Sequence, residues 1–249
     1  MKQTDYPSPL LPELPAKPGA RLDWGRLYGS SFGLAIHAAA TRHGAPAMAI
    51  VPDTPTALRL EQELQFFNHG AEQPLPVLSF PDWETLPYDI FSPHQEIISQ
   101  RLATLYRLPE LGNGILIVPV STLMQQLPPQ HYLDAHALML DTGQRLDLEG
   151  LRQRLENSGY NCVSQVMEHG EFAVRGSLID LFPMGSRQPY RIDLFDDEIE
   201  SIRTFDPETQ RTLEKVEKAH LLPAREFPLT PEAIKQFRQA YRDQIEGEL

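Results

Sequence analysis

The stretch YRIDLFDDEIESIRTF, residues 190–205, decides how the second half of this chain folds. Apolar and polar side chains alternate along residues 190–195, which is the period of a half-buried β-strand. Asp196-Asp197 then interrupts the alternation, as a turn does, so we expect two strands joined there. Tyr190, Ile192 and Leu194 share one face of the first strand, and we assign that face to the core.

The opposite face of this strand carries Arg191, Asp193 and Phe195. An arginine beside an aromatic side chain on a solvated face is the composition of a protein–protein hot spot. The alternative is that Phe195 lies under a neighbouring helix and that Arg191 only pairs with Asp193. The strand pattern alone leaves both readings open.

Short strands separated by turns extend over residues 160–205, with further turns at His169-Gly170 and Met184-Gly185. Before them, residues 136–140 predict a strand and residues 147–158 a helix that Gly159 ends. This half of the chain therefore predicts an antiparallel sheet with one helix, an α+β fold.

The first half has a different pattern, in which Val- and Ile-rich runs alternate with amphipathic segments. Thr54-Pro55 supplies a helix cap and a proline for the first turn, and apolar residues then recur at helical spacing. Ser121 is expected to cap a short helix over 122–127. Such β-α-β-α alternation predicts a parallel α/β domain. Near the end of the chain, Thr230-Pro231 opens a helix that we expect to run to Glu246.

Composition narrows the classes of function. The chain has 249 residues and a net charge of −12, which argues against neutralising DNA phosphates as its main role. Its single cysteine, Cys162, cannot form an internal disulfide. The start lacks the apolar core of a signal peptide, and the longest apolar run, residues 115–120, is too short to cross a bilayer. We expect a cytoplasmic protein without membrane contact.

No motif for catalysis or for a cofactor is evident. The segment Gly29–Ala35 resembles a phosphate loop but is one residue short between its glycines, and Leu34 and Ala35 stand where Lys and Ser or Thr are required. His131, His136 and Cys162 lack the spacing of metal ligands. The acidic residues at 193–200 could hold a divalent cation, but two strands joined by a solvated turn at Asp196-Asp197 explain them more simply. We therefore expect no catalytic residue, bound cofactor or metal.

Several longer strings resemble the bacterial transcription-repair coupling factors. In the first half these are DWETLPYD at residues 82–89 and FSPHQ at 91–95. In the second half they are VMEHGE at 166–171, RG at 175–176, DLFPMG at 180–185 and DLFDDE at 193–198. The last three also resemble UvrB, the DNA-loading subunit of the excision nuclease. The strings occur in order over nearly the whole chain after residue 20, so the resemblance is specific.

The resemblance implies a fold similar to the first two domains of UvrB. It predicts a helicase-like α/β domain, a degenerate relative of RecA and of UvrB domain 1, at residues 21–134. An α+β domain like UvrB domain 2 is expected as an insert at 135–222. A proline-rich lead would occupy 1–20, and 223–249 would begin the return of the chain to the first domain, cut short here.

The resemblance also implies a function. In UvrB-like proteins the second domain docks UvrA, and the family's contact positions fall on Arg175, Arg191 and Phe195. This implies a non-enzymatic adaptor that brings UvrA to RNA polymerase stalled at a DNA lesion, in transcription-coupled nucleotide excision repair. ATP, magnesium, RNA polymerase and double-stranded DNA would engage parts of the full-length translocase further along the chain.

The chain departs from UvrB at two places. The phosphate loop lacks its Lys and Thr, and the segment from Pro93 runs almost directly into a helix at 97–108, which leaves no room for UvrB's DNA-clamping hairpin. Two other functions stay open at this point: a nucleotide-binding domain of a helicase, and an auxiliary DNA-contact module.

Overall fold

The computed structural model describes residues 8–86 and 89–247, which form two compact units. The first unit combines the chain up to Asp82 with Arg107–Gln126, and the second combines Trp83–Tyr106 with the chain from Leu127 onward. Pro87 and Tyr88, which belong to one of the family strings, lie outside the described residues. The predicted domain boundaries at 134 and 222 concern family domains and stay predictions.

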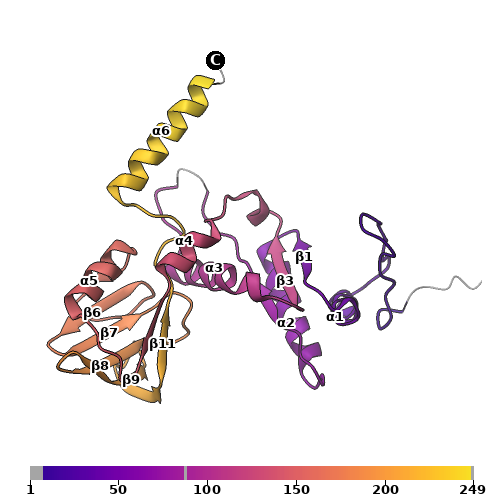
Figure 1. Cartoon of the computed structure of the whole chain (residues 1–249). Helices are drawn as coiled ribbons and strands as arrows, with labels where there is room; N and C mark the ends of the chain where they lie inside the picture. Colours follow the sequence, from indigo (N-terminus) through magenta and orange to yellow (C-terminus); the bar gives the residue numbers. More distant parts are fainter. Residues whose placement is uncertain (1–7, 87–88, 248–249) are drawn as a thin grey trace, which may run out of the picture. The chain divides into compact units, whose positions relative to one another are not determined.

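The first unit contains a three-stranded parallel sheet, as the sequence predicts (Figure 1). Its strands are β1 (Ala47–Val51), β2 (Val77–Ser79) and β3 (Ile115–Pro119), in the order β1-β3-β2. Helices α1 (Ser31–His43) and α2 (Thr54–Asn68) belong to the same unit, with the short 3-10 helices η1 (Leu108–Glu110) and η2 (Thr122–Met124). Its core is aliphatic and consists of Ala40, Ala49, Val51, Ala57, Leu60, Leu64, Leu75, Ile115 and Ile117.

Two predicted helix boundaries in this unit are wrong. Asp53, not Thr54, caps α2, since its carboxylate accepts a hydrogen bond from the Thr56 N–H at 2.8 Å. The helix expected over 122–127 is only the single turn η2, and the Ser121 side chain does not cap it. Pro128 explains part of this early end, because a proline disfavours helical geometry in the residue before it.

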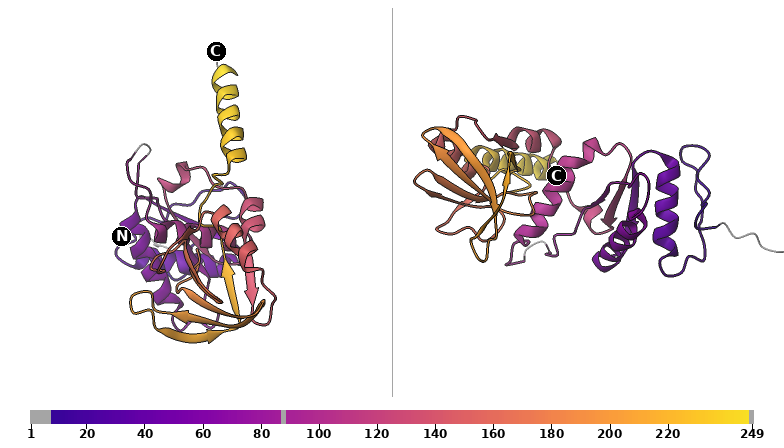
Figure 2. Two further views of the ribbon diagram at one scale, coloured as in Figure 1. Left: turned by 90° about the vertical axis from the view of Figure 1, so that its left-hand side faces the viewer. Right: turned by 90° about the horizontal axis from the view of Figure 1, so that it is seen from below.

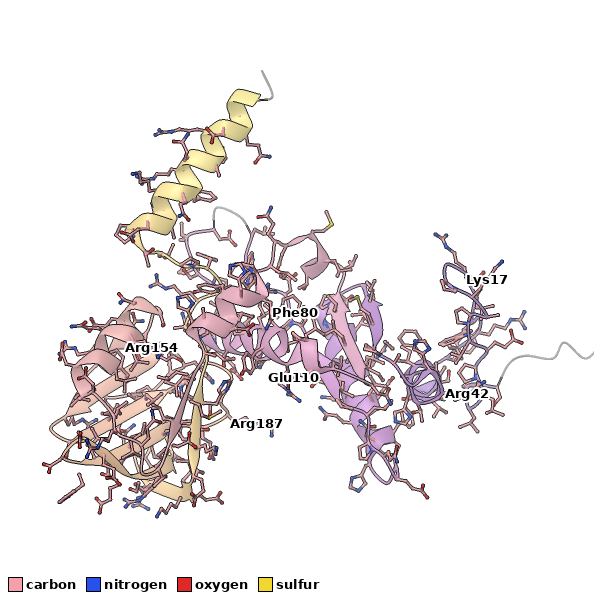
Figure 3. All side chains as sticks on the ribbon, viewed as in Figure 1. Lys17, Arg42, Phe80, Glu110, Arg154 and Arg187 are labelled. Atoms are coloured by element: carbon pink, nitrogen blue, oxygen red, sulfur yellow. The ribbon has the colours of Figure 1, made fainter. Side chains whose placement is uncertain are left out.

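The segment before α1 is attached to its own unit by hydrogen bonds to backbone carbonyls. The Arg42 guanidinium, labelled in Figure 3, donates to the Pro12 carbonyl at 2.5 Å. The Trp24 indole N–H donates to the carbonyl of Glu13 at 3.1 Å. These contacts fix the course of the proline-rich lead where the structure describes it.

The second unit is built on a six-stranded sheet with the order β10-β9-β8-β7-β6-β5. Its strands are coloured mostly orange in the two views of Figure 2. All of its strand pairs are antiparallel except β5 with β6. The strands are β5 (Asn161–Cys162), β6 (Glu171–Arg175), β7 (Leu178–Phe182), β8 (Tyr190–Phe195), β9 (Glu198–Phe205) and β10 (Thr212–Val216). A separate antiparallel ladder joins β4 (Leu138–Asp141) to β11 (Lys218–Leu221).

The helices of this unit are α3 (Gln95–Arg107), α4 (Gln130–His136), α5 (Leu148–Asn157) and α6 (Pro231–Gly247). The predicted helix at 147–158 is confirmed as α5. The strand predicted from His136 is partly wrong, because His136 ends α4 and the strand begins at Leu138. None of the helices in the described part of the chain is long and apolar enough to span a membrane.

The alternation predicted for β8 is confirmed. Ile192 and Leu194 are buried, while Phe195 on the other face is exposed. The turn to β9 falls at the predicted place, and Asp196 adopts a left-handed conformation with φ 53°, which Asp tolerates better than most residues. One face of the sheet is thus apolar, and the other is free to carry polar groups.

A buried ion pair holds α3 to the segment that follows β11. The Arg101 guanidinium donates two hydrogen bonds to the Glu226 carboxylate, at 2.5 and 3.1 Å, and both side chains are buried. The Trp83 indole donates to the same carboxylate at 3.0 Å, and the guanidinium lies 4.7 Å from the indole ring. The carboxylate is thus held by charge-assisted bonds from two directions.

Replacing Arg101 by Met should lower the free energy of unfolding by about 3–5 kcal/mol, because it leaves the Glu226 carboxylate buried without its cation. Urea unfolding followed by tryptophan fluorescence measures this, since Trp83 contacts that carboxylate. The control is R152M, which removes an exposed pair with Glu156 and should change the midpoint little. Equal effects of the two substitutions would contradict a special role for the buried pair.

Candidate functional site

The segment Gly29–Ala35 forms the start of α1 and not a phosphate cradle. Gly29 has a positive φ of 56°, and the Ser31 hydroxyl donates to the Tyr28 carbonyl at 2.7 Å. Gly33 packs so closely on α2 that an added Cβ would lie 2.5 Å from a carboxylate oxygen of Glu63. A carboxylate at the N-terminal turn of a helix takes the place that a phosphate would need.

The candidate metal ligands do not come together. His131 and His136 both lie on α4, where His136 Nδ1 is 2.8 Å from the Tyr132 carbonyl. Cys162 is exposed on β5. Within residues 8–86 and 89–247, no group of three or more His, Cys, Asp or Glu side chains could hold a metal ion.

The polar face of the six-stranded sheet does bring charged side chains together. Strand register places Asp180 opposite Arg191, and Arg191 opposite Arg203, in one row across β7, β8 and β9. The next row contains Arg175, Leu178 and Asp193, also on adjacent strands. Two of the predicted site residues, Arg175 and Arg191, therefore lie on one face of one sheet.

Asp180 is the centre of this arrangement. Its side chain is 1% exposed and accepts two hydrogen bonds from the Arg191 guanidinium, at 2.7 and 2.9 Å. Arg175 lies 3.5 Å from the same carboxylate. One buried anion thus holds both arginines. The bidentate geometry with Arg191 is the more directional contact, and it fixes the plane of that guanidinium.

Besides its pair with Asp180, the Arg191 guanidinium contacts an aromatic ring and a backbone carbonyl. Its guanidinium lies 4.7 Å from the centre of the Phe205 ring and donates to the Gln210 carbonyl at 3.2 Å. The hydrogen bonds to Asp180 raise the pKa of Arg191 above its usual value, against the lowering effect of burial. Its side chain is 16% exposed. Arg191 is therefore a fixed cation with one accessible edge, not a mobile surface charge.

Phe195, at the end of β8, is 71% exposed. This contradicts the alternative in which a helix covers Phe195. The second part of that alternative is also wrong, because Arg191 pairs with Asp180, whereas Asp193 pairs with Arg203 at 3.5 Å. An exposed phenylalanine on the strand that also carries Arg191 is an accessible apolar anchor.

Arg175, at the end of β6, is the least constrained of the predicted site residues. Its side chain is 48% exposed, and its guanidinium donates to the Ser164 carbonyl at 3.3 Å. Gly176 follows with a φ of 63°, a conformation that favours glycine, and begins the turn into β7. The arginine–glycine pair in the sequence is thus a strand end followed by the residue that the turn requires.

Sequence reasoning missed two residues that contact the Arg191 guanidinium: Asp180, which pairs with it, and Phe205, whose ring lies against it. The signal for Asp180 was its place at the centre of LIDLF, where it shares a face with Leu178 and Phe182. A lone carboxylate among apolar neighbours needs a cation. Phe205 lies in a small apolar cluster on the same side, with Val166, Ala173 and Phe182, and this cluster supports the guanidinium.

Known proteins resemble the chain over almost all of its length. The family model of the UvrB interaction domain matches residues 138–227. This range contains the whole charged face of the six-stranded sheet, which consists of Arg175, Asp180, Arg191, Asp193 and Arg203. A transcription-repair-coupling factor of Escherichia coli (strain K12) is 52% identical over 233 residues, covering 94% of this chain and 20% of the relative. Its counterpart in Haemophilus influenzae is 47% identical over 93% of this chain and 20% of the relative. The chain spans about a fifth of the length of these curated relatives.

Replacing Asp180 by Asn keeps the shape of the side chain but removes the charge that two arginines share. We expect the free energy of unfolding to fall on the order of 3 kcal/mol, because the Arg191 guanidinium then lacks its anion in a largely buried position. Chemical denaturation measures the loss. The matched control is Asp197→Asn at the β8–β9 turn, where the pair with Arg145 is exposed and its loss should change stability little.

Proposed function

The chain belongs to the transcription-repair-coupling factor family along 94% of its length, and on that premise we propose that the charged face of its six-stranded sheet docks UvrA. Docking would bring the damage-recognition machinery to RNA polymerase stalled at a lesion, as transcription-coupled nucleotide excision repair requires. In this proposal Phe195 is the apolar anchor, and Arg191 and Arg175 are the cations that orient the partner.

The exposure of Phe195 is the observation that carries the proposal. A phenylalanine that is 71% exposed on an ordered strand contributes no core packing, so its burial would be gained only on binding. Ordered cations on the same face support the assignment, because a hot spot combines an apolar anchor with charges that select the partner. The match of residues 138–227 to the UvrB interaction domain supports UvrA as that partner.

The mechanism we propose is mimicry of UvrB. The sheet presents the surface that UvrB would present, and UvrA would contribute acidic groups opposite the arginines. Because Arg191 is already paired with Asp180, the incoming carboxylate would approach its accessible edge and not replace Asp180. This gives orientation without breaking the buried pair, whose loss would be costly.

The first unit would then be a helicase-like domain, related to RecA and UvrB domain 1, that does not use ATP. The Glu63 carboxylate packed on Gly33 supports this part of the proposal. ATP and magnesium would serve a motor elsewhere in the full-length cytoplasmic protein, which would also engage RNA polymerase and double-stranded DNA. The segment after residue 222 would return to the helicase-like domain.

The docking proposal predicts that F195A and R191A each weaken UvrA binding by about 2 kcal/mol, roughly thirtyfold. Phe195 would lose its buried ring, and Arg191 its charge-assisted contact. Titration of the purified chain with UvrA, by calorimetry or surface plasmon resonance, measures both affinities.

The control for the ring is F66A, because Phe66 on α2 is 74% exposed and lies outside the charged face. We expect UvrA affinity to be unchanged in this variant. Circular dichroism checks that each variant stays folded. If F195A binds UvrA as tightly as the unmodified chain does, the docking assignment is wrong.

The segment Gly29–Ala35 at the start of α1 provides a separate prediction. ATP with magnesium should not saturate the chain at micromolar concentration, because Leu34 and Ala35 supply neither the cation nor the hydroxyl of a phosphate loop. Equilibrium dialysis or calorimetry tests this. Saturable micromolar binding would favour a working nucleotide-binding domain. Retention of that binding in the variant Gly33→Val, which clashes with Glu63, would then locate the site elsewhere.

A further inference from the structure

We propose that Arg203 and Lys215 continue the docking surface from Arg191 to the edge of the sheet. The three cations would form one row that attracts and aligns a strip of carboxylates on the partner protein. This inference rests on the proposed docking of UvrA, and it adds residues that neither the sequence analysis nor the family resemblance singled out.

Strand register establishes the row. Arg191 on β8 lies opposite Arg203 on β9, and Arg203 lies opposite Lys215 on β10. Neighbouring strands are about 4.8 Å apart, so the row crosses roughly 10 Å of the sheet and reaches its last strand. Figure 1 shows β8 and β9 side by side in the second unit. The Arg191 guanidinium also donates to the Thr212 hydroxyl of β10 at 3.4 Å, which ties the edge strand to the row.

Like charges directly opposite one another destabilise a sheet, so this row needs compensation. Asp180 compensates Arg191, and Asp193 lies 3.5 Å from Arg203. Lys215 is exposed, and no ion pair holds it among the residues that the structure describes. The closest and most buried ion pair is therefore at the Arg191 end of the row, and the sheet edge has the least compensation of its positive charge.

The chemistry of the partner follows from the contrast with the rest of the chain. The net charge is −12, so a row of cations is not a consequence of a basic composition. Asp193 lies beside the row, and the same hairpin turns at Asp196-Asp197. These carboxylates would repel a continuous phosphate backbone. A protein surface can place carboxylates opposite the cations alone, so we assign the row to an acidic protein strip and not to nucleic acid.

The row and the anchor should act on different steps of binding. Arg203 is 45% exposed, and exposed charges at the rim of an interface chiefly change the association rate and its salt dependence. Phe195 and Arg191 would instead be desolvated in the complex, and their loss changes the dissociation rate. This difference separates the row from the docking residues already proposed.

The test is the association rate of the purified chain with UvrA, measured by stopped flow for R203Q, K215E and the double variant. We expect K215E to slow association about tenfold at low salt, with little change in dissociation. The effect should largely vanish near 0.5 M salt, where screening shortens the reach of surface charges. R203Q avoids placing a new carboxylate beside Asp193, and K215E alters only an exposed edge position, so the latter tests the row even if the former fails to fold.

Arg154 supplies the matched control, because it is an exposed cation on α5 and not on the sheet (Figure 3). R154E should leave the association rate unchanged within twofold. If F195A weakens UvrA binding while K215E and R154E associate alike, the row is overturned and the docking proposal stands. If the unmodified chain does not bind UvrA, both are overturned. Duplex DNA binding that K215E abolishes would reassign the row to nucleic acid.

Discussion

The ion pair between Arg101 and Glu226 is the interaction on which the second unit depends. It joins residues 125 positions apart, and all six strands of the larger sheet lie in the sequence between them. A buried pair is seldom the most stable option for a core, since apolar residues can replace it with similar stability. What it adds is specificity, because the guanidinium accepts one carboxylate geometry and the Trp83 indole donates to the same oxygen as the Arg101 Nε. Helix α3, which precedes the sheet in sequence, and the segment that follows β11 are thereby held in one fixed relative position.

A similar device shapes the charged face. Asp180 is a buried carboxylate that two arginines share, but here the cations stay partly exposed, Arg191 at 16% and Arg175 at 48%. The apolar cluster around Phe205 excludes water beneath Arg191, which strengthens the pair by lowering the local dielectric. The sheet can carry several charges on one face because each row of cations has an anion within it or beside it. Rigid strands then fix the spacing of those charges better than loops would.

Local sequence pattern predicted much of this fold. It failed where contacts between residues distant in sequence determine the helix cap or the partner of an ion pair. Alternation in Tyr190–Phe195 placed the core face correctly, and β-α-β alternation predicted the parallel sheet. The cap at Asp53 was missed because Thr54 is also a good cap, and only geometry chooses between them. The partner of Arg191 was missed because Asp193 is nearer in sequence, whereas strand pairing brings Asp180 opposite. Arg101 shows no local signal at all, since its partner follows β11.

The fixed position of Arg191 has a consequence for the entropy of binding. A free arginine loses about 2 kcal/mol of side-chain conformational entropy when it is immobilised. In this chain, Asp180, Phe205 and the Gln210 carbonyl have already restricted those torsions before any partner arrives. The side-chain entropy of Arg191 is therefore lost when the chain folds, and it is not lost again each time a partner binds. Arg175 has looser contacts and keeps more of its freedom. Two arginines that share one carboxylate therefore differ in how much order a partner must still impose on them.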